Sequence, residues 1–130
     1  MNGDMLFKDE GYQITGACFE VHNHMGCGFL EAVYQECLEL EFSEKRIPFV
    51  AQPNLKLKYK KYALKKHYVP DFLCYDKIVV EIKTEKKLEN IDHAQIINYL
   101  KATRLELGIL VNFGHYPKLE IERFVNTKHK

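Results

Sequence analysis

The feature that most constrains the fold is the stretch from Pro70 to Thr84, where charged residues interrupt strongly apolar sequence. Its two halves, Phe72 to Tyr75 and Ile78 to Ile82, have the aromatic and β-branched composition of strands, with the polar pair Asp76-Lys77 between them. A run this apolar is typical of a strand buried on both faces. The stretch therefore predicts two neighbouring strands joined by a tight turn.

Three charged residues, Asp71, Glu81 and Lys83, lie within these predicted strands. Because side chains alternate between the faces of a strand, Glu81 and Lys83 share one face with Val79. Burying a carboxylate or an ammonium group is costly unless the charge is paired or binds a metal. The three charges therefore indicate either a functional site or a structural ion-pair network.

The length of the turn decides whether the two acids can meet. Directly opposed residues of an antiparallel pair project from the same face. A two-residue loop, Asp76-Lys77, would oppose Asp71 to Ile82 and separate the carboxylates. A three-residue loop from Tyr75, or a five-residue loop, would oppose Asp71 to Glu81. Because a shared metal needs both acids on one face, we expect three or five residues, unless a bulge intervenes.

The whole chain predicts one α/β domain, residues 1–130. Its 130 residues, 46% hydrophobic and 28% charged, are enough for a core and exclude a disordered chain. No apolar run approaches the ~18 residues of a membrane span, and residues 1–10 contain no signal-peptide core. The four cysteines form no C-x-x-C pair, which favours reduced thiols and a cytoplasmic location.

Hydrophobic periodicity predicts the order of the elements. Helices are expected at 10–24, 29–45 and 91–103, and strands at 47–50, 54–59, 64–75, 78–84, 107–113 and 118–125. Asn90 is the expected N-cap of the last helix, which has the right size for a crossover between parallel strands. We therefore expect a mixed sheet with helices packed against it, followed by a frayed basic tail at 127–130.

Two further features each leave two interpretations open. Glu31 flanks the apolar stripe of the second helix, where an acid either interacts with the helix dipole or belongs to a site. Residues 48–67 contain six lysines and no acid on a chain of net charge +1. Such a basic hairpin either contacts nucleic-acid phosphates or prevents aggregation at a sheet edge. The lysines in question include Lys56, Lys58, Lys60 and Lys61.

The segment from Gly28 to Tyr34 matches G-x-x-E-x-x-Y, the signature of the GxxExxY protein family, a bacterial group within the PD-(D/E)XK nuclease superfamily. The resemblance covers roughly residues 10–125. It continues at Pro70-Asp71, Glu81-Ile82-Lys83, His93-Ala94-Gln95, Asn98 to Ala102 and Asn112-Phe113-Gly114. Gln95 and Tyr99, one helical turn apart, resemble the RecB-like branch. The resemblance implies a restriction-endonuclease-like fold with the core order αβββαβ.

The resemblance also implies metal-dependent hydrolysis of phosphodiester bonds, in DNA more than in RNA. Asp71, Glu81 and the carbonyl of Ile82 would hold Mg²⁺ or Mn²⁺, and Glu31 would add a ligand directly or through water. Lys83 would position or deprotonate the attacking water. On this basis we expect the three carboxylates and the lysine to converge in one cleft, with a raised pKa for at least one acid.

Three residues have supporting roles in this interpretation. Gln95, at the rim of the cleft, would orient water or a phosphate oxygen. Tyr34 would brace Glu31, and Tyr99 would contact the substrate or support the site, although both tyrosines could equally be packed core residues. Two alternatives remain: a catalytically silent nuclease-like module that binds nucleic acid or protein, and a small interaction protein with structural ion pairs. A homodimer also remains open.

Overall fold

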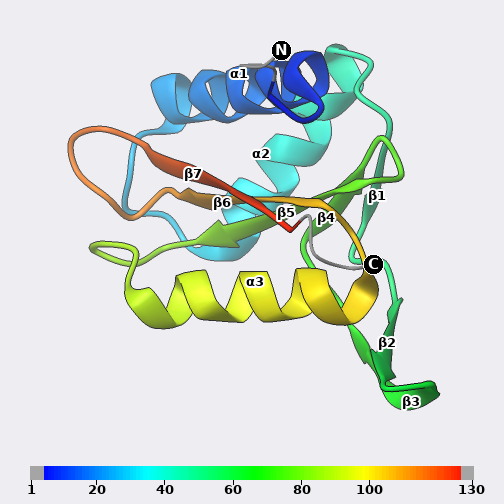
Figure 1. Ribbon diagram of the computed structural model, residues 1–130. Helices are drawn as coiled ribbons and strands as arrows, with labels where there is room; N and C mark the ends of the chain where they lie inside the picture. The colour runs from blue at the N-terminus through cyan, green and yellow to red at the C-terminus, as the bar shows by residue number, and fades with distance from the viewer. Residues whose placement is uncertain (1–4, 127–130) are drawn as a thin grey trace.

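The computed structural model describes residues 5–126 and shows a five-stranded sheet with helices on both faces (Figure 1). The expected tail at 127–130 lies outside the described residues. The helices are α1 (Lys8–Met25), α2 (Glu31–Glu44) and α3 (Asn90–Thr103). The strands are β1 (Phe49–Ala51), β2 (Leu55–Tyr59), β3 (Tyr62–Tyr68), β4 (Phe72–Cys74), β5 (Ile78–Lys83), β6 (Leu107–Asn112) and β7 (Glu120–Val125).

The main sheet has the order β1-β4-β5-β6-β7. β5 and β6 are parallel and are connected by α3, as expected for a crossover helix, whereas the other neighbours are antiparallel. Together α2, β1, β4, β5, α3 and β6 give the expected order αβββαβ. β2 and β3 form a separate two-stranded sheet. In the sequence they lie between β1 and β4, which are neighbours in the main sheet. The mixed architecture is that of the expected restriction-endonuclease-like fold.

Two local expectations were wrong. The single strand expected at 64–75 is divided into β3 and β4, because the pairing stops at residues 69–71, where Pro70 has no backbone N–H to donate. The N-cap of α3 is Glu89 rather than Asn90. Glu89 and Asp92 form a reciprocal capping box, in which each side chain accepts the backbone N–H of the other residue.

Both faces of the sheet are buried, which explains the nearly continuous apolar sequence of β5 and β6. α1 and α2 cover the face that carries Ile78, Val80 and Ile82, and α3 covers the face that carries Val79 (Figure 1). α3 approaches the sheet closely at Gly108, where an added Cβ would lie 2.7 Å from Cδ1 of Ile96.

All four cysteines are free thiols, as expected, and two of them, Cys18 and Cys74, are buried. Burial raises the pKa of both buried thiols, so they remain protonated packing groups at neutral pH. Among residues 5–126, no helix has the length and apolar composition needed to cross a bilayer.

Candidate functional site

The turn between β4 and β5 brings the two central acids to the same face. Phe72 pairs with Val80 and Cys74 pairs with Ile78, so the loop has three residues, starting at Tyr75. Extending this register by one residue places Asp71 opposite Glu81. Glu81 faces the α3 side together with Val79, and the predicted three-residue turn is confirmed, whereas the ladder itself ends at Phe72 and does not include Asp71.

Asp71 lies against the edge of β5 immediately before β4 begins. Its Oδ2 accepts a hydrogen bond of 2.6 Å from the backbone N–H of Ile82. Successive residues of a strand direct their backbone polar groups to opposite edges. The Lys83 carbonyl accepts the Phe113 N–H on the β6 side, so the Ile82 carbonyl faces the edge where Asp71 lies. Burial raises the pKa of Asp71, although the Ile82 N–H and Lys83 oppose the rise.

Glu81 is held by Tyr68, a residue that the sequence analysis did not identify. The Tyr68 hydroxyl donates a hydrogen bond to Oε2 of Glu81. The Tyr68 ring stacks on the Tyr99 ring, with centroids 3.8 Å apart and planes inclined by 5°. Tyr99 therefore packs directly against the residue that bonds to Glu81. An aromatic residue at a strand end normally indicates core packing, so the sequence carried no signal that Tyr68 faces a carboxylate.

The electrostatics of Glu81 show that the acids and the lysine act on one another. Burial raises the pKa of Glu81 to about 7. The negative charges of Asp71 and Glu31 add to this rise, whereas the hydrogen bond from Tyr68 and the positive charge of Lys83 oppose it. The expectation of a raised carboxyl pKa, opposed by the lysine, agrees with this arrangement.

Lys83 lies at the end of β5, on the same face as Glu81. Its Nζ is 3.8 Å from Oδ1 of Asp92, a buried acid of α3. Asp92 also accepts the backbone N–H of Glu89 at 2.9 Å, which fixes its carboxylate at the helix start. Sequence reasoning missed Asp92 because its part in the capping box explains its position without reference to Lys83.

Glu31 is the first residue of α2 and is largely exposed. Partial burial of its carboxyl group raises its pKa, the charge of Asp71 adds to the rise, and Lys83 opposes it. Glu31 is therefore within electrostatic range of Asp71 and Lys83, although no described residue hydrogen bonds to its side chain.

Tyr34 shapes the loop before α2 and does not contact the Glu31 side chain directly. Its hydroxyl donates to the Gly26 carbonyl at 2.6 Å and accepts the Phe29 N–H at 3.3 Å. Its ring stacks on Phe113, with centroids 4.3 Å apart. Gly28 has a φ of 110°, a conformation that favours glycine. Gly28 and Tyr34 thus fix the loop that leads into Glu31. Tyr34 therefore affects the position of Glu31 only through this loop.

Gln95 lies apart from the carboxylates. It lines a hollow between α3 and the β2–β3 hairpin, here called the α3–hairpin hollow. The lining residues are Leu57, Leu64, Gln95, Asn98, Tyr99 and Ala102. No interaction joins Gln95 to Asp71 or Glu81 among the described residues. Its connection to the site runs through Tyr99, one turn further along α3, and the ring stack with Tyr68.

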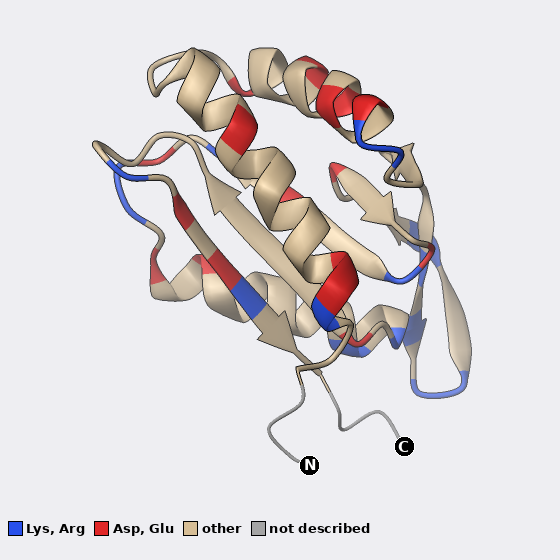
Figure 2. Cartoon of the chain, turned by 90° about the horizontal axis from the view of Figure 1, so that it is seen from above, with Lys and Arg blue, Asp and Glu red and all other residues tan. Residues whose placement is uncertain are grey.

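The six lysines of residues 48–67 are all exposed on the β2–β3 hairpin, which projects from the body beyond α3 (Figure 1). Figure 2 shows the basic colour of its strands and turn. Lys56 and Lys58 alternate with the half-buried Leu55 and Leu57, as expected. Lys60 and Lys61 form the two-residue turn between the paired Tyr59 and Tyr62.

The oxygen atoms of the cluster fit a hard divalent cation. Oδ1 of Asp71 and Oε1 of Glu81 accept no hydrogen bond from residues 5–126, and the Ile82 carbonyl faces the same edge. Two carboxylates and a carbonyl, completed by water, form a ligand set that suits Mg²⁺. No group of three or more His, Cys, Asp or Glu side chains in that range has metal-binding spacing. Glu31 is therefore better suited to contact a metal through water.

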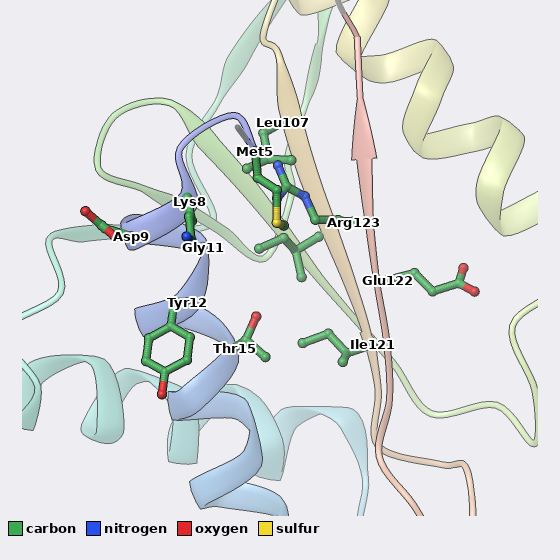
Figure 3. Close-up of a pocket in the computed structure, with 11 residues that line it drawn as sticks. Met5, Lys8, Asp9, Gly11, Tyr12, Thr15, Leu107, Ile121, Glu122 and Arg123 are labelled. Carbon is green, nitrogen blue, oxygen red and sulfur yellow. The ribbon is translucent and has the colours of Figure 1, made fainter. Parts of the chain in front are cut away.

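A second hollow lies on the opposite side of the sheet, between α1 and strands β6 and β7 (Figure 3). Its walls are largely apolar, with Met5, Tyr12 and Ile121 among the lining residues. Arg123 at its edge donates a hydrogen bond to the Leu6 carbonyl at 2.7 Å. The hollow lies on the α1 side, so it is separate from the carboxylates that face α3.

A family model described as the PD-(D/E)XK nuclease superfamily matches residues 8–124. The match includes all three helices, the acidic cluster and Lys83. Comparisons with curated proteins and with solved structures give no match.

Proposed function

The chain belongs to the PD-(D/E)XK nuclease superfamily, and we propose that it is a metal-dependent nuclease that hydrolyses phosphodiester bonds, preferentially in DNA. The observation that supports this most is that the Asp71 carboxylate bonds to the Ile82 N–H, directly beside Glu81, with one carboxylate oxygen free on each acid. We further assign the chain to the GxxExxY group and the RecB-like branch, on the motif around Glu31 and the pair Gln95 and Tyr99.

Asp71, Glu81 and the Ile82 carbonyl are the proposed ligands of Mg²⁺ or Mn²⁺, with Glu31 in contact through water. When bound, the cation would lower the pKa of a water molecule and offset negative charge on the phosphate. The Ile82 N–H and Tyr68 each hold one carboxylate oxygen, which orients the other oxygen before the ion arrives.

Lys83 is the proposed catalytic cation. Its ammonium group, within electrostatic range of all three acids, would donate hydrogen bonds to the attacking water and to a phosphate oxygen. Asp92, on its other side, would hold the lysine side chain in position. Tyr34 acts as a support through the loop before α2, and Tyr99 through Tyr68.

The proposed partner is nucleic acid, with Lys56, Lys58, Lys60 and Lys61 as phosphate contacts. We propose that Gln95 contacts the substrate nucleotide, since it lies apart from the carboxylates. A cytoplasmic location in a bacterial cell is in keeping with the four free thiols and the family resemblance. Homodimerisation is an expectation to test by light scattering.

One observation favours a second candidate, a catalytically silent module that binds nucleic acid. The six exposed lysines of the β2–β3 hairpin can bind phosphates whether or not the acids hold a metal. Such a module would bind nucleic acid through the same lysines without metal-dependent turnover.

Cleavage assays separate the two candidates. Purified protein is incubated with single- and double-stranded DNA and RNA in Mg²⁺, in Mn²⁺ or in EDTA. We expect metal-dependent cleavage that is lost in Asp71→Asn and retained in Asp76→Asn. Asp76 is a suitable control because it lies exposed in the adjacent turn. Binding without cleavage of any substrate would favour the silent module, and full activity of Asp71→Asn would refute the proposed ligand set.

A further inference from the structure

The β2–β3 hairpin has two chemically different faces. Leu55 and Leu57 pack towards α3, and the lysines between and after them point away from it. Tyr59 and Tyr62 are directly paired at the tip and are 58% and 57% exposed. Because side chains alternate along a strand, Tyr59 lies on the same face as Leu57, and its partner Tyr62 shares that face. The apolar and aromatic face of the hairpin therefore extends beyond the part that α3 covers.

The α3–hairpin hollow lies where this surface meets the helix. Leu57 and Leu64 supply apolar walls from the hairpin, and Tyr99 and Ala102 line the hollow from α3. The amide side chains of Gln95 and Asn98 also line it, and neither hydrogen bonds to a described residue. Apolar walls combined with free amide donors and acceptors suit a flat, polar-edged ring.

Tyr99 and Tyr68 connect the hollow to the proposed cleavage site. Tyr99, in the wall of the hollow, stacks on Tyr68, and Tyr68 donates a hydrogen bond to Glu81. A single pair of stacked rings therefore separates the hollow from the carboxylates. The six exposed lysines of the same hairpin add positive charge near the hollow, which attracts a phosphate backbone.

We propose that the α3–hairpin hollow binds an unpaired nucleobase of a single-stranded nucleic acid, next to the proposed cleavage site. The base packs between Leu57, Leu64 and the Tyr99 ring, and the amides of Gln95 and Asn98 bond to its edge. Bases in a duplex are stacked and paired, so they cannot enter such a hollow without being flipped out. This inference deepens the proposed nuclease function and relies on it for the role of the neighbouring carboxylates.

Binding measured without metal tests the hollow independently of catalysis. The probe is a labelled single-stranded oligonucleotide of about 12 nucleotides, within the usual range of such sites, and binding is followed by fluorescence anisotropy in EDTA. We expect Ala102→Phe, which fills the hollow, to weaken binding of the oligonucleotide about tenfold. This is the size of effect seen when other proteins that bind single strands lose one base-stacking contact. The double variant Gln95→Ala with Asn98→Ala, which leaves the apolar packing in place, should weaken it by a similar factor.

The matched control is Ala94→Phe, because Ala94 is exposed on the same helix and does not line the hollow. It should bind the single strand as the wild type does. Two further probes are a duplex of equal length and an oligonucleotide with abasic positions through its centre. For each of these two probes, the Kd of the hollow variants should lie within about twofold of the wild-type Kd, since lysine–phosphate contacts do not require bases.

Unchanged single-strand binding in the double variant would overturn the inference, as would an equal loss for the abasic probe or for the duplex. The outcome is separable from the nuclease proposal. A protein that cleaves, but whose hollow variants bind normally, refutes the base-binding hollow alone. A protein that never cleaves, but shows the base-dependent loss, supports the hollow and refutes the nuclease function.

Discussion

The hydroxyl group of Tyr68 donates a hydrogen bond to Glu81 and so connects the base of the lysine-rich hairpin to the centre of the main sheet. β3 pairs only with β2, and Tyr68 is its last residue. The hairpin therefore ends at the carboxylate of the proposed site. Tyr99 of α3 completes this junction by stacking on the Tyr68 ring.

Removing the Tyr68 hydroxyl should loosen the Glu81 carboxylate. Tyr68→Phe keeps the ring stack but leaves a buried carboxylate oxygen without its donor, at a cost of about 1–3 kcal/mol in the free energy of unfolding. Loss of such a supporting contact should also weaken metal binding about 10–100-fold. Urea denaturation and calorimetric Mn²⁺ titration check the two effects, with the exposed Tyr12→Phe as control. Wild-type metal affinity in Tyr68→Phe would contradict the positioning role.

The raised pKa of Glu81 predicts a pH dependence of stability in the absence of metal. Its folded-state pKa of about 7 exceeds the ordinary value of 4.5. Between these values the folded state binds more protons than the unfolded state, so stability falls as pH rises. The loss approaches about 3 kcal/mol across this window. Urea unfolding in EDTA at pH 5 and pH 8 measures this fall in the free energy of unfolding, which should be much smaller in Glu81→Gln than in the wild type. Equal falls in the two proteins would show that another group titrates.

A divalent cation should stabilise the fold by relieving repulsion between the acids. At a concentration about 100 times its Kd, an ion that binds only the folded state adds about 2.7 kcal/mol to the free energy of unfolding. Thermal melts at neutral pH should therefore shift upwards with Mn²⁺ or Mg²⁺. Asp71→Asn should lose the shift and Asp76→Asn should keep it. An unchanged wild-type melting temperature in saturating metal would exclude a functional metal site.

Lys83→Ala should abolish cleavage while leaving the fold intact. The Lys83–Asp92 pair is long, at 3.8 Å, and Asp92 also accepts the Glu89 N–H, so loss of the lysine should cost about 1–3 kcal/mol and leave the protein folded. Cleavage rate and urea midpoint are measured in parallel, with the exposed Lys118→Ala as the matched control. Retained cleavage would remove Lys83 from the proposed mechanism.

The hairpin lysines should determine the salt dependence of nucleic-acid binding. Replacing Lys56 and Lys58 with alanine should weaken duplex binding and reduce the slope of log K against log salt by about 2. The control replaces Lys8 and Lys118, two exposed lysines outside the hairpin. Anisotropy titrations at several salt concentrations give both slopes. If the two double variants have the same slope as the wild type, the hairpin lysines serve solubility instead.

The three-residue turn between β4 and β5 was predictable because an antiparallel pair allows only two parities of turn length, and only one can unite the acids. The crossover helix followed from its length and its place between two apolar strands. The hydrogen bond from Tyr68 to Glu81 could not be predicted in the same way. Glu81 lies 13 residues further along the chain and belongs to a different sheet. The role of Tyr68 depends on where the hairpin departs from the sheet, which local patterns do not specify.

The N-cap of α3 shows a similar limit. Asn90 is the stronger intrinsic cap, but Glu89 takes the position because Asp92 completes a reciprocal pair with it. Asp92 in turn lies beside Lys83. The residue that caps α3 therefore depends on Asp92, which also interacts with Lys83 on β5. N-cap propensity alone accounts for neither of these tertiary interactions.

β2 and β3 are inserted in the sequence between two strands of the main sheet, so the proposed phosphate contacts and the proposed metal ligands lie in separate segments of the chain. The register of β4 and β5 is set by the three-residue turn after Cys74, which lies outside the hairpin. Substitutions between Lys56 and Lys66 can therefore alter the charge and shape of the arm without altering the spacing of the acids. If the proposed function holds, substrate preference could change through this one exposed segment while the residues that would hold the metal stay in place.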